Sequence, residues 1–251
     1  MRQLTATVCI LYMLLSGVRA DNFDKNQLIA WCIVPFDAKQ RGPAERAEML
    51  VRLGIKRVAY DWRAKHVKEF EEEILQYKKH GLEFFAFWGE HEDAFRLFQK
   101  HGIHPQIWQM LRNSDASTQK ARVKAAATAM LPLVKRTRQL GCDLGLYNHG
   151  GWGGEPANLV AVCNYLQKHH RAKHVGIVYN LHHAHGHIAN FEKSLKLMLP
   201  HLLCLNLNGM NEEANPKILP LGQGEHELAM LKIICRSGYK NPIGILDHRS
   251  D

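Results

Sequence analysis

The chain has 251 residues, 46% of them hydrophobic, and a formal net charge of +9 at pH 7. A chain of this length can bury one substantial core, and an α/β barrel fits it as a single domain. Lysine and arginine are scattered along the predicted helices. The positive charge therefore indicates a solvated basic surface and disfavours a nucleic-acid partner.

The first twenty residues predict a secretory signal peptide. Arg2 precedes the apolar run LTATVCILYMLLSGV, and small residues precede Asp21. The run is too short to span a bilayer, and no second one follows it. We therefore expect cleavage after Ala20 and export of residues 21–251, secreted or periplasmic, without a membrane anchor. Loss of Arg2 and Arg19 lowers the formal charge from +9 to +7.

From residue 21 onward, strand and helix patterns alternate. Short, nearly continuous apolar runs predict strands at 28–36, 57–62, 82–88, 105–111, 144–149, 175–180, 202–210 and 242–248. Helical patterns between them cover 43–53, 69–80, 90–101, 117–140, 156–170, 190–199 and 225–237. Five of these helices run into a glycine that suits a left-handed C-cap, at Gly54, Gly81, Gly102, Gly141 and Gly238. Pro43 suits a first helical position, and Pro132 is expected to kink the fourth helix.

This alternation predicts an α/β fold, namely a single-domain (β/α)8 TIM barrel that lacks its eighth helix. An open doubly wound sheet is the alternative, but no glycine-rich phosphate loop follows the first strand. The sequence ends at Asp251, directly after the eighth predicted strand. We therefore expect either a truncated version of a longer protein or a partner surface over the gap, most simply a second copy in a homo-oligomer.

The cysteines of the mature chain do not predict a disulfide framework. They are Cys32, Cys142, Cys163, Cys204 and Cys235, an odd number with uneven spacing and mostly apolar neighbours. A disulfide scaffold is normally shorter and more regular. We expect buried free thiols, with at most one or two bridges.

Polar residues interrupt the apolar runs where the strands end, which is the catalytic end of a TIM barrel. The early strands end near Asp61, Arg63, Glu90 and Gln109, and the later ones near Asn148, His149, Asn180, Asn206, Asn208, Asp247 and His248. The segment YNLHHAHGHI after the sixth strand adds His182, His183, His185 and His187. We expect Asn148, His149, Asn180, His183, Asn206, Asn208, Asp247 and His248 to line one cavity.

Aromatic and glycine-rich segments occupy the same end of the barrel. Trp31, Trp62, Trp88, Trp108 and Trp152 lie in or directly after the first five strands. They either pack the upper core or receive the C–H faces of a sugar ring. The loop YNHGGWGGEP is interpreted as facing the substrate, and LGQGEHEL as a weaker candidate for holding a polar ligand at a helix start.

Several motifs together resemble the xylose isomerase-like TIM barrels. They are YNHGGWGGEP, YNLHHAHGH, LNLNGMN, LPLGQGE and GYKNPIGILDHR, and with the rhythm of strands the match spans the whole mature chain. The resemblance is to an exported, uncharacterised branch of this superfamily, which holds sugar isomerases and epimerases, inosose dehydratases and endonuclease IV. It implies a small carbohydrate or cyclitol as partner. PKILPLG lacks the Asp-x-His that endonuclease chemistry needs, so DNA repair is excluded.

The resemblance also implies a metal site, because the superfamily's epimerases hold a divalent ion through carboxylates and histidine on strands five to eight. These positions fall here on Gly145, Asn180, Asn206, and Asp247 or His248. Only one of them is a carboxylate, whereas Mn²⁺ and Mg²⁺ prefer carboxylate oxygens. We expect a divalent metal (Mn, Mg or Zn) to be absent; if one is bound, its ligands are His183, His248 and Asp247, and not His187.

Three functions remain open, and the first is an exported sugar or cyclitol isomerase or epimerase that moves a proton next to a carbonyl. Its base would be Asp247 or Glu225, its acid and base partner His183 or His149, and its oxyanion donors Asn180 and Asn206. Substrate contacts would come from Asn148, Trp152, Asn180, Asn206, Asn208, Trp88 and Trp108. The alternative is a non-catalytic carbohydrate-binding barrel without the metal. A glycoside hydrolase is disfavoured, because its only candidate carboxylates, Glu90 and Asp247, lie five strands apart.

Overall fold

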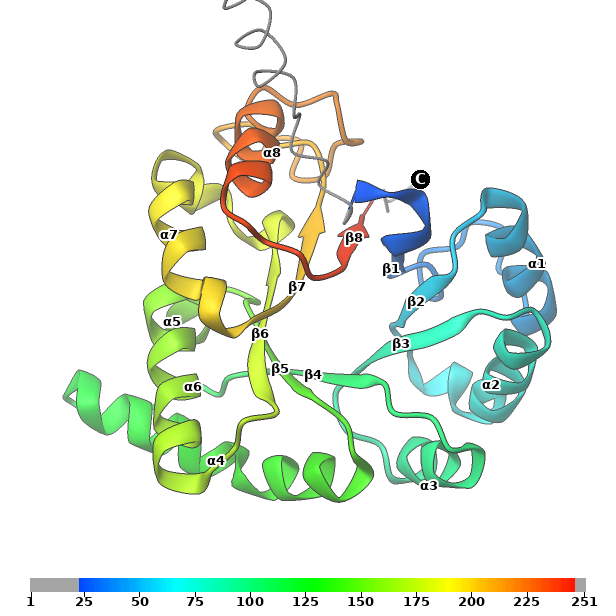
Figure 1. Ribbon diagram of the computed structural model, residues 1–251, viewed down its shortest axis with the longest axis horizontal. Coiled ribbons are helices and arrows are strands. Elements are labelled where there is room, and N and C mark those ends of the chain that lie inside the picture. Colours follow the sequence, from blue (N-terminus) through cyan, green and yellow to red (C-terminus); the bar gives the residue numbers. More distant parts are fainter. Residues whose placement is uncertain (1–22, 247–251) are drawn as a thin grey trace, which may run out of the picture.

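The computed structural model describes residues 23–246, so the predicted signal peptide, Asp247 and His248 lie outside the described range. Parallel strands form a closed barrel in sequence order, β1 to β8 (Figure 1). They are β1 (Leu28–Trp31), β2 (Arg57–Tyr60), β3 (Glu83–Trp88), β4 (Gln106–Met110), β5 (Leu144–Tyr147), β6 (Val175–Asn180), β7 (Leu202–Leu207) and β8 (Ile243–Ile245). The predicted (β/α)8 barrel is confirmed.

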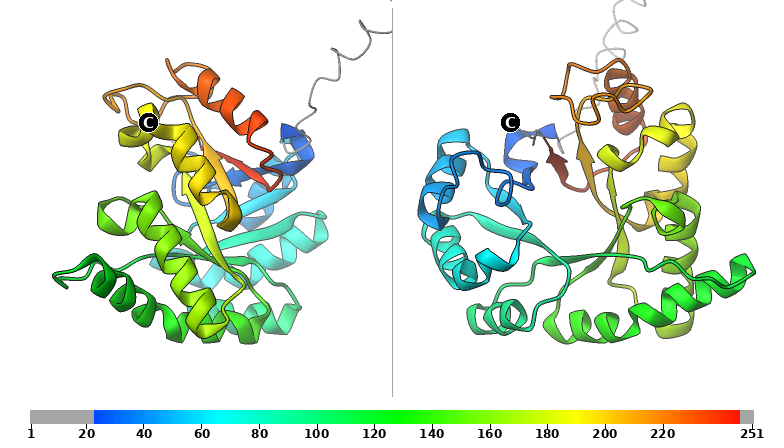
Figure 2. Two further views of the ribbon diagram at one scale, coloured as in Figure 1. Left: turned by 60° about the vertical axis from the view of Figure 1, so that its left-hand side comes forward. Right: turned by 180° about the vertical axis from the view of Figure 1, so that it is seen from behind.

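Helices surround the strands on the outside of the barrel (Figure 2). They are α1 (Pro43–Leu53), α2 (Phe70–Lys79), α3 (Glu92–His101), α4 (Gln119–Leu140), α5 (Gly151–Gly154), α6 (Pro156–His170), α7 (Phe191–Met198) and α8 (Glu227–Arg236). Strands covered on both faces need apolar residues on both faces, which explains their continuous apolar runs. Helix α8 lies between β7 and β8, and the expected absence of a helix after β8 concerns residues beyond the described range.

The barrel closes through β1 and β8, where Leu28 lies opposite Ile243 and Ala30 opposite Ile245. Strand β1 is shorter than predicted, because Cys32 adopts a left-handed backbone conformation with φ 55° and ends the strand. Left-handed backbone is costly for a residue with a β-carbon, so the surrounding structure must hold Cys32 in place.

The predicted helix signals explain the helix ends. Gly54, Gly102 and Gly141 are C-caps with φ of 68°, 59° and 67°, the left-handed conformation that glycine adopts without a steric cost. Pro43 is the first residue of α1, and α4 continues without a break through Pro132. The one addition is α5, a single helical turn inside the glycine-rich loop after β5.

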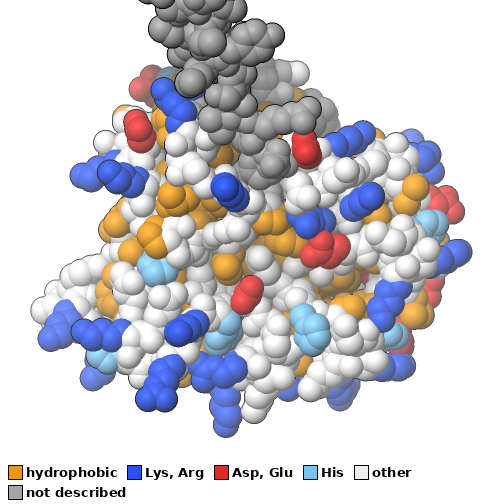
Figure 3. All heavy atoms as spheres, viewed as in Figure 1, with side chains coloured by type: hydrophobic (Ala, Val, Ile, Leu, Met, Phe, Trp, Pro, Cys, Tyr) orange, Lys and Arg blue, Asp and Glu red, His pale blue; other side chains and the backbone are white. Residues whose placement is uncertain are grey.

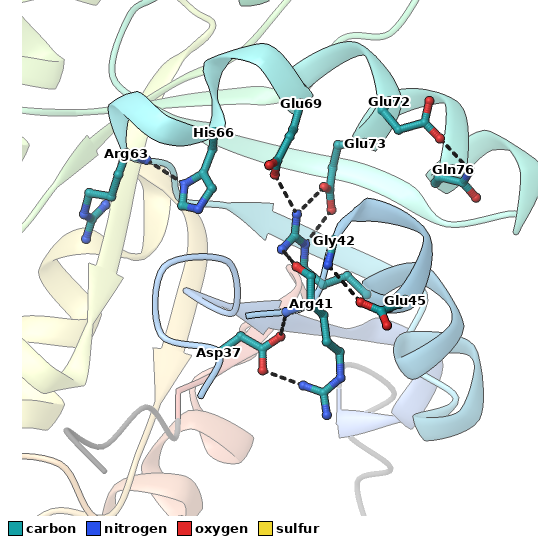
Figure 4. Close-up of polar contacts among 11 residues, drawn as sticks. Asp37, Arg41, Gly42, Glu45, Arg63, His66, Glu69, Glu72, Glu73 and Gln76 are labelled. Atoms are coloured by element: carbon teal, nitrogen blue, oxygen red, sulfur yellow. Dashed lines mark hydrogen bonds and ion pairs between the residues drawn. The ribbon is translucent and has the colours of Figure 1, made fainter. Parts of the chain in front are cut away.

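A buried ion pair holds α1 against α2. Arg46 Nε and Nη2 donate to the two carboxylate oxygens of Glu73 at 3.1 and 2.7 Å, and Glu69 lies 3.6 Å from Nη2 (Figure 4). Arg46 and Glu73 are 2% and 0% exposed. Two parallel hydrogen bonds between a guanidinium and a carboxylate compensate both charges where water cannot.

The five cysteines of the described range are all free, as the sequence predicted. Four of them are buried, and Cys235 is partly exposed. Lysine and arginine side chains are spread around the face shown in Figure 3 and form no single basic patch there. Within residues 23–246, no helix is both long and apolar enough to cross a bilayer.

Candidate functional site

The site is a cavity of about 370 Å³ at the C-terminal ends of the strands. Its walls come from loops that follow β1, β2, β5 and β6 and from the ends of β3, β4, β5 and β6. The lining residues are Cys32, Phe36, Asp61, Arg63, Trp88, Met110, Tyr147, His149, Asn180, His182 and His183. This is the end of the barrel at which the sequence placed the site.

Two histidines form one wall. His149 follows β5, and His183 closes the 3₁₀ turn Leu181–His183 after β6; their ring centroids lie 4.4 Å apart. The Tyr147 ring meets the His183 ring edge-on at 5.7 Å. Burial, and then the neighbouring His182 and His149, lower the pKa of His183 to about 3. His183 is therefore uncharged near neutral pH and a weak base, and its ring can donate one N–H hydrogen bond.

Asp61 supplies a carboxylate to the wall formed by β1 and β2. Its Oδ1 lies 2.7 Å from Arg63 Nη1, and its carboxylate lies near the Cys32 thiol. Burial, and then the charge of Asp61, raise the pKa of the Cys32 thiol, which stays protonated. Sequence reasoning noted Asp61 at a strand end but gave it no chemical role; its position after β2 was the signal.

The predicted asparagines form a hydrogen-bonded network between the strand ends. Asn148 donates through Nδ2 to the backbone oxygen of Asn180 at 3.0 Å and accepts from its backbone N–H at 2.7 Å. Asn180 Nδ2 donates to the Tyr147 hydroxyl at 2.6 Å, and Asn206 Nδ2 donates to Asn180 Oδ1 at 2.6 Å. Asn180 is the member of this network that lines the cavity. Its amide, like that of Asn206, is already engaged, which limits both as oxyanion donors.

The remaining predicted residues are dispersed. Asn208 is fully buried and donates to the backbone oxygen of Gly209. Glu225 is exposed in the loop before α8 and lies outside the set of lining residues. Trp152 donates to Gln119 at 2.9 Å, away from the cavity. Asp247 and His248 lie outside the described residues.

The tryptophans divide between cavity and core. Trp88 lines the cavity and meets Trp31 and Trp108 edge-on, at 5.3 and 4.6 Å between ring centroids. Trp31 and Trp108 lie 4.3 Å apart and are 2% and 0% exposed. These two indoles fill the barrel interior below the cavity, so Trp108 has no surface left for a ligand.

Within residues 23–246, the positions that the resemblance assigns to metal ligands on strands five to seven do not suit a divalent ion. A β-carbon added at Gly145 would lie 2.5 Å from Val178 Cγ2 and 2.8 Å from Trp108 Cδ1, so no longer side chain fits there. Asn180 and Asn206 are neutral amides, and residues 23–246 contain no group of three His, Cys, Asp or Glu side chains able to hold a metal. Both ring nitrogens of His187 are engaged, by Tyr179 at 2.7 Å and Glu155 at 3.0 Å.

A second cavity of about 370 Å³ adjoins the first. It is lined by Gln109, Met110, Leu111, Arg112, Asn113, Tyr147, His149, Gly150 and Gly153. Met110, Tyr147 and His149 line both cavities. The side chain of His149 therefore stands at the junction between the two.

No family model and no curated protein matches the chain by sequence. Three solved structures share the fold. The 3-keto-D-glucoside 4-epimerase YcjR from E. coli is 13% identical, with a TM-score of 0.67 over 90% of this chain and 94% of that one. The IolI protein with a bound zinc atom is 13% identical, with 0.67 over 89% of each chain. A xylose isomerase domain protein from Planctomyces limnophilus is 12% identical, with 0.64 over 88% and 90%.

Proposed function

Since the chain has the fold of the xylose isomerase-like TIM barrels, we propose that it is an isomerase or epimerase of a sugar or cyclitol. The observation that carries the proposal is the pair His149 and His183 in one cavity with Asp61. In the closed barrel order, β5 is four strands from β1, and β6 is four strands from β2. The carboxylate of Asp61 and the imidazoles of His149 and His183 are therefore on opposite sides of the cavity.

The proposed chemistry is a proton transfer next to a carbonyl. Asp61 takes a proton from the carbon beside the carbonyl, and uncharged His183 donates an N–H hydrogen bond to the carbonyl oxygen, so that the substrate becomes an enediol or enediolate. For an isomerisation, Asp61 returns the proton to the neighbouring carbon. For an epimerisation, His149, across the cavity, delivers a proton to the opposite face of the same carbon, and exchange with solvent restores both groups. Trp88 offers an apolar ring to the C–H face of the ligand.

We propose that this chemistry proceeds without a divalent metal. The support is steric and chemical, because the Trp108 ring and Val178 occupy the space beside Gly145, and Asn180 and Asn206 offer no charge. In the superfamily the ion would stabilise the enediolate oxygen. Elemental analysis of the purified protein checks this, and a stoichiometric metal that stays bound through chelator dialysis would contradict it.

Solvent exchange tests the proton transfer before the substrate is known. The protein is incubated in D₂O with candidate ketoses, aldoses and oxidised cyclitols, and loss of the C–H signal beside the carbonyl is followed by NMR. We expect exchange with the wild type, and at least about a hundredfold slower exchange for His183→Ala, the range that the loss of one oxyanion donor costs. His169→Asn, at an exposed histidine near the end of α6, is the matched control and should exchange at the wild-type rate.

A non-catalytic carbohydrate-binding barrel is the second candidate, favoured by the same filled metal position. It predicts sugar binding by calorimetry, weakened by Trp88→Ala, together with no deuterium exchange for any sugar of the panel. Absence of both binding and exchange would refute the two candidates together.

Export of the mature chain remains part of the proposal. The support is the leader-like composition of residues 1–20. Expression of the full chain in a secreting host, followed by N-terminal sequencing of the medium fraction, should give a protein that begins at Asp21. Retention of the intact chain in the cell would contradict it.

A further inference from the structure

We infer that the ligand has two sugar-sized units, a disaccharide or a glycoside of similar length, bound across the two adjoining cavities. The inference rests on the proposed function and names the substrate class for the same site. Its basis is that both cavities are lined by Met110, Tyr147 and His149. A ligand bound in one cavity can therefore extend into the other along these shared side chains.

The size of each cavity supports one unit in each. Small-molecule sites occupy roughly 300–1,000 Å³, and each cavity, at about 370 Å³, lies near the lower end of that range. A free monosaccharide would occupy one cavity and leave the other to water. A ligand of two linked rings uses both.

The second cavity has the side chains of a recognition site. Gln109, Arg112 and Asn113 supply amide and guanidinium groups, which hydrogen-bond hydroxyls in defined directions. These three cannot remove a proton from carbon. The base Asp61 and the hydrogen-bond donor His183 line the first cavity only, so the first unit reacts and the second is recognised.

The junction between the cavities suits a sugar ring as well. Met110 is 46% exposed although it is apolar, and it presents a flexible thioether surface to both cavities. Gly153 of the glycine-rich loop lines the second cavity and packs closely on β4's end, because a β-carbon there would lie 2.9 Å from Leu111 Cβ.

Calorimetry with matched sugars tests the inference on the full chain. The probes are glucose, galactose and mannose, and the disaccharides cellobiose, lactose and mannobiose. We expect a disaccharide to bind at least tenfold more tightly than its monosaccharides. The double variant Arg112→Ala/Asn113→Ala should lose that tenfold gain and keep the monosaccharide affinity. Arg96→Ala, at an exposed arginine of α3, is the charge-matched control and should keep both affinities.

The outcomes separate this inference from the proposed function. Equal affinity for monosaccharides and disaccharides in the wild type overturns the two-unit ligand and leaves the proposed function standing. No binding of any probe, together with no deuterium exchange for any compound of the NMR panel, overturns both. If the double variant does not fold, saturation-transfer NMR on the wild type decides instead: saturation of both rings of a disaccharide supports the inference, and saturation of one ring alone overturns it.

Discussion

Replacement of Gly145 by alanine tests whether the barrel interior is as full as the Trp108 ring and Val178 make it. The new methyl group would lie 2.5 Å from Val178 Cγ2 and 2.8 Å from Trp108 Cδ1. Both neighbours are 0% exposed, so neither side chain can move toward solvent. Gly145 lies within strand β5, and backbone strain is not a second cause.

The expected cost follows from these contacts. Overpacking a filled core lowers the free energy of unfolding by about 1–3 kcal/mol. Because Gly145→Ala creates two contacts shorter than the van der Waals distance, both with buried side chains, we expect a loss of about 2–3 kcal/mol. For a domain of this size, each kcal/mol lowers Tm by roughly 2–4 °C, so Gly145→Ala should melt about 4–12 °C below the wild type. Urea unfolding followed by circular dichroism gives the free energy of unfolding directly.

Two variants make the result specific. Gly186→Ala is the control, because no atom lies within 4 Å of its added β-carbon, and it should change stability by less than about 0.5 kcal/mol. Val178→Ala removes the nearest contact, so the double variant with Gly145→Ala should cost less than the two single changes added together. Strict additivity, or a Gly145→Ala protein as stable as Gly186→Ala, would refute the steric argument against a metal ligand at this position.

Three further predictions concern charge and strain. Glu73→Leu leaves Arg46 charged in the core with Glu69, at 3.6 Å, as its remaining carboxylate neighbour, and should cost about 3–5 kcal/mol in urea unfolding. Glu71→Gln, at an exposed pair, should cost much less. Between about pH 6.5 and about pH 3, His183 is protonated in the unfolded chain and uncharged in the folded chain. The free energy of unfolding should therefore decrease as the pH is lowered through this window. His183→Asn should flatten that fall in urea titrations, and an unchanged slope would contradict the burial of this imidazole. The free energy of unfolding of Cys32→Gly should exceed that of Cys32→Ala by about 1 kcal/mol, because glycine adopts φ 55° without strain. Equal stability of the two variants would count against a strained backbone.

The order of strands and helices was readable from the sequence because its signals are local. A basic residue, a glycine C-cap such as Gly54 or Gly141, and a short apolar run occur within a few residues of one another, and each repeat marks one βα unit. The direction of individual side chains was not readable. Strands of a covered barrel are apolar on both faces, so no alternation distinguishes the interior from the helix layer. The placement of Trp108 inside the barrel and of Trp88 at the cavity therefore required the structure.

The sequence indicated the location of the cavity better than it indicated which side chains line it. Polar residues at strand ends marked the end of the barrel at which the cavity lies. Whether each amide faces a ligand or a neighbouring strand depends on register, and Asn148 and Asn206 turned out to bond Asn180. Asp61 reaches the cavity through the turn after β2 and its pairing with Arg63, which sequence spacing does not reveal.

The free cysteine thiols can report local opening of the fold. Cys204 lies among the side chains inside the barrel, while Cys142 and Cys163 lie in the layer between barrel and helices. Burial raises the pKa of all three, so a thiol-specific reagent reacts only when the surrounding layer opens. Labelling rates, resolved by peptide mass spectrometry, would therefore compare detachment of the helices with rupture of the barrel itself, in one sample and without an engineered reporter.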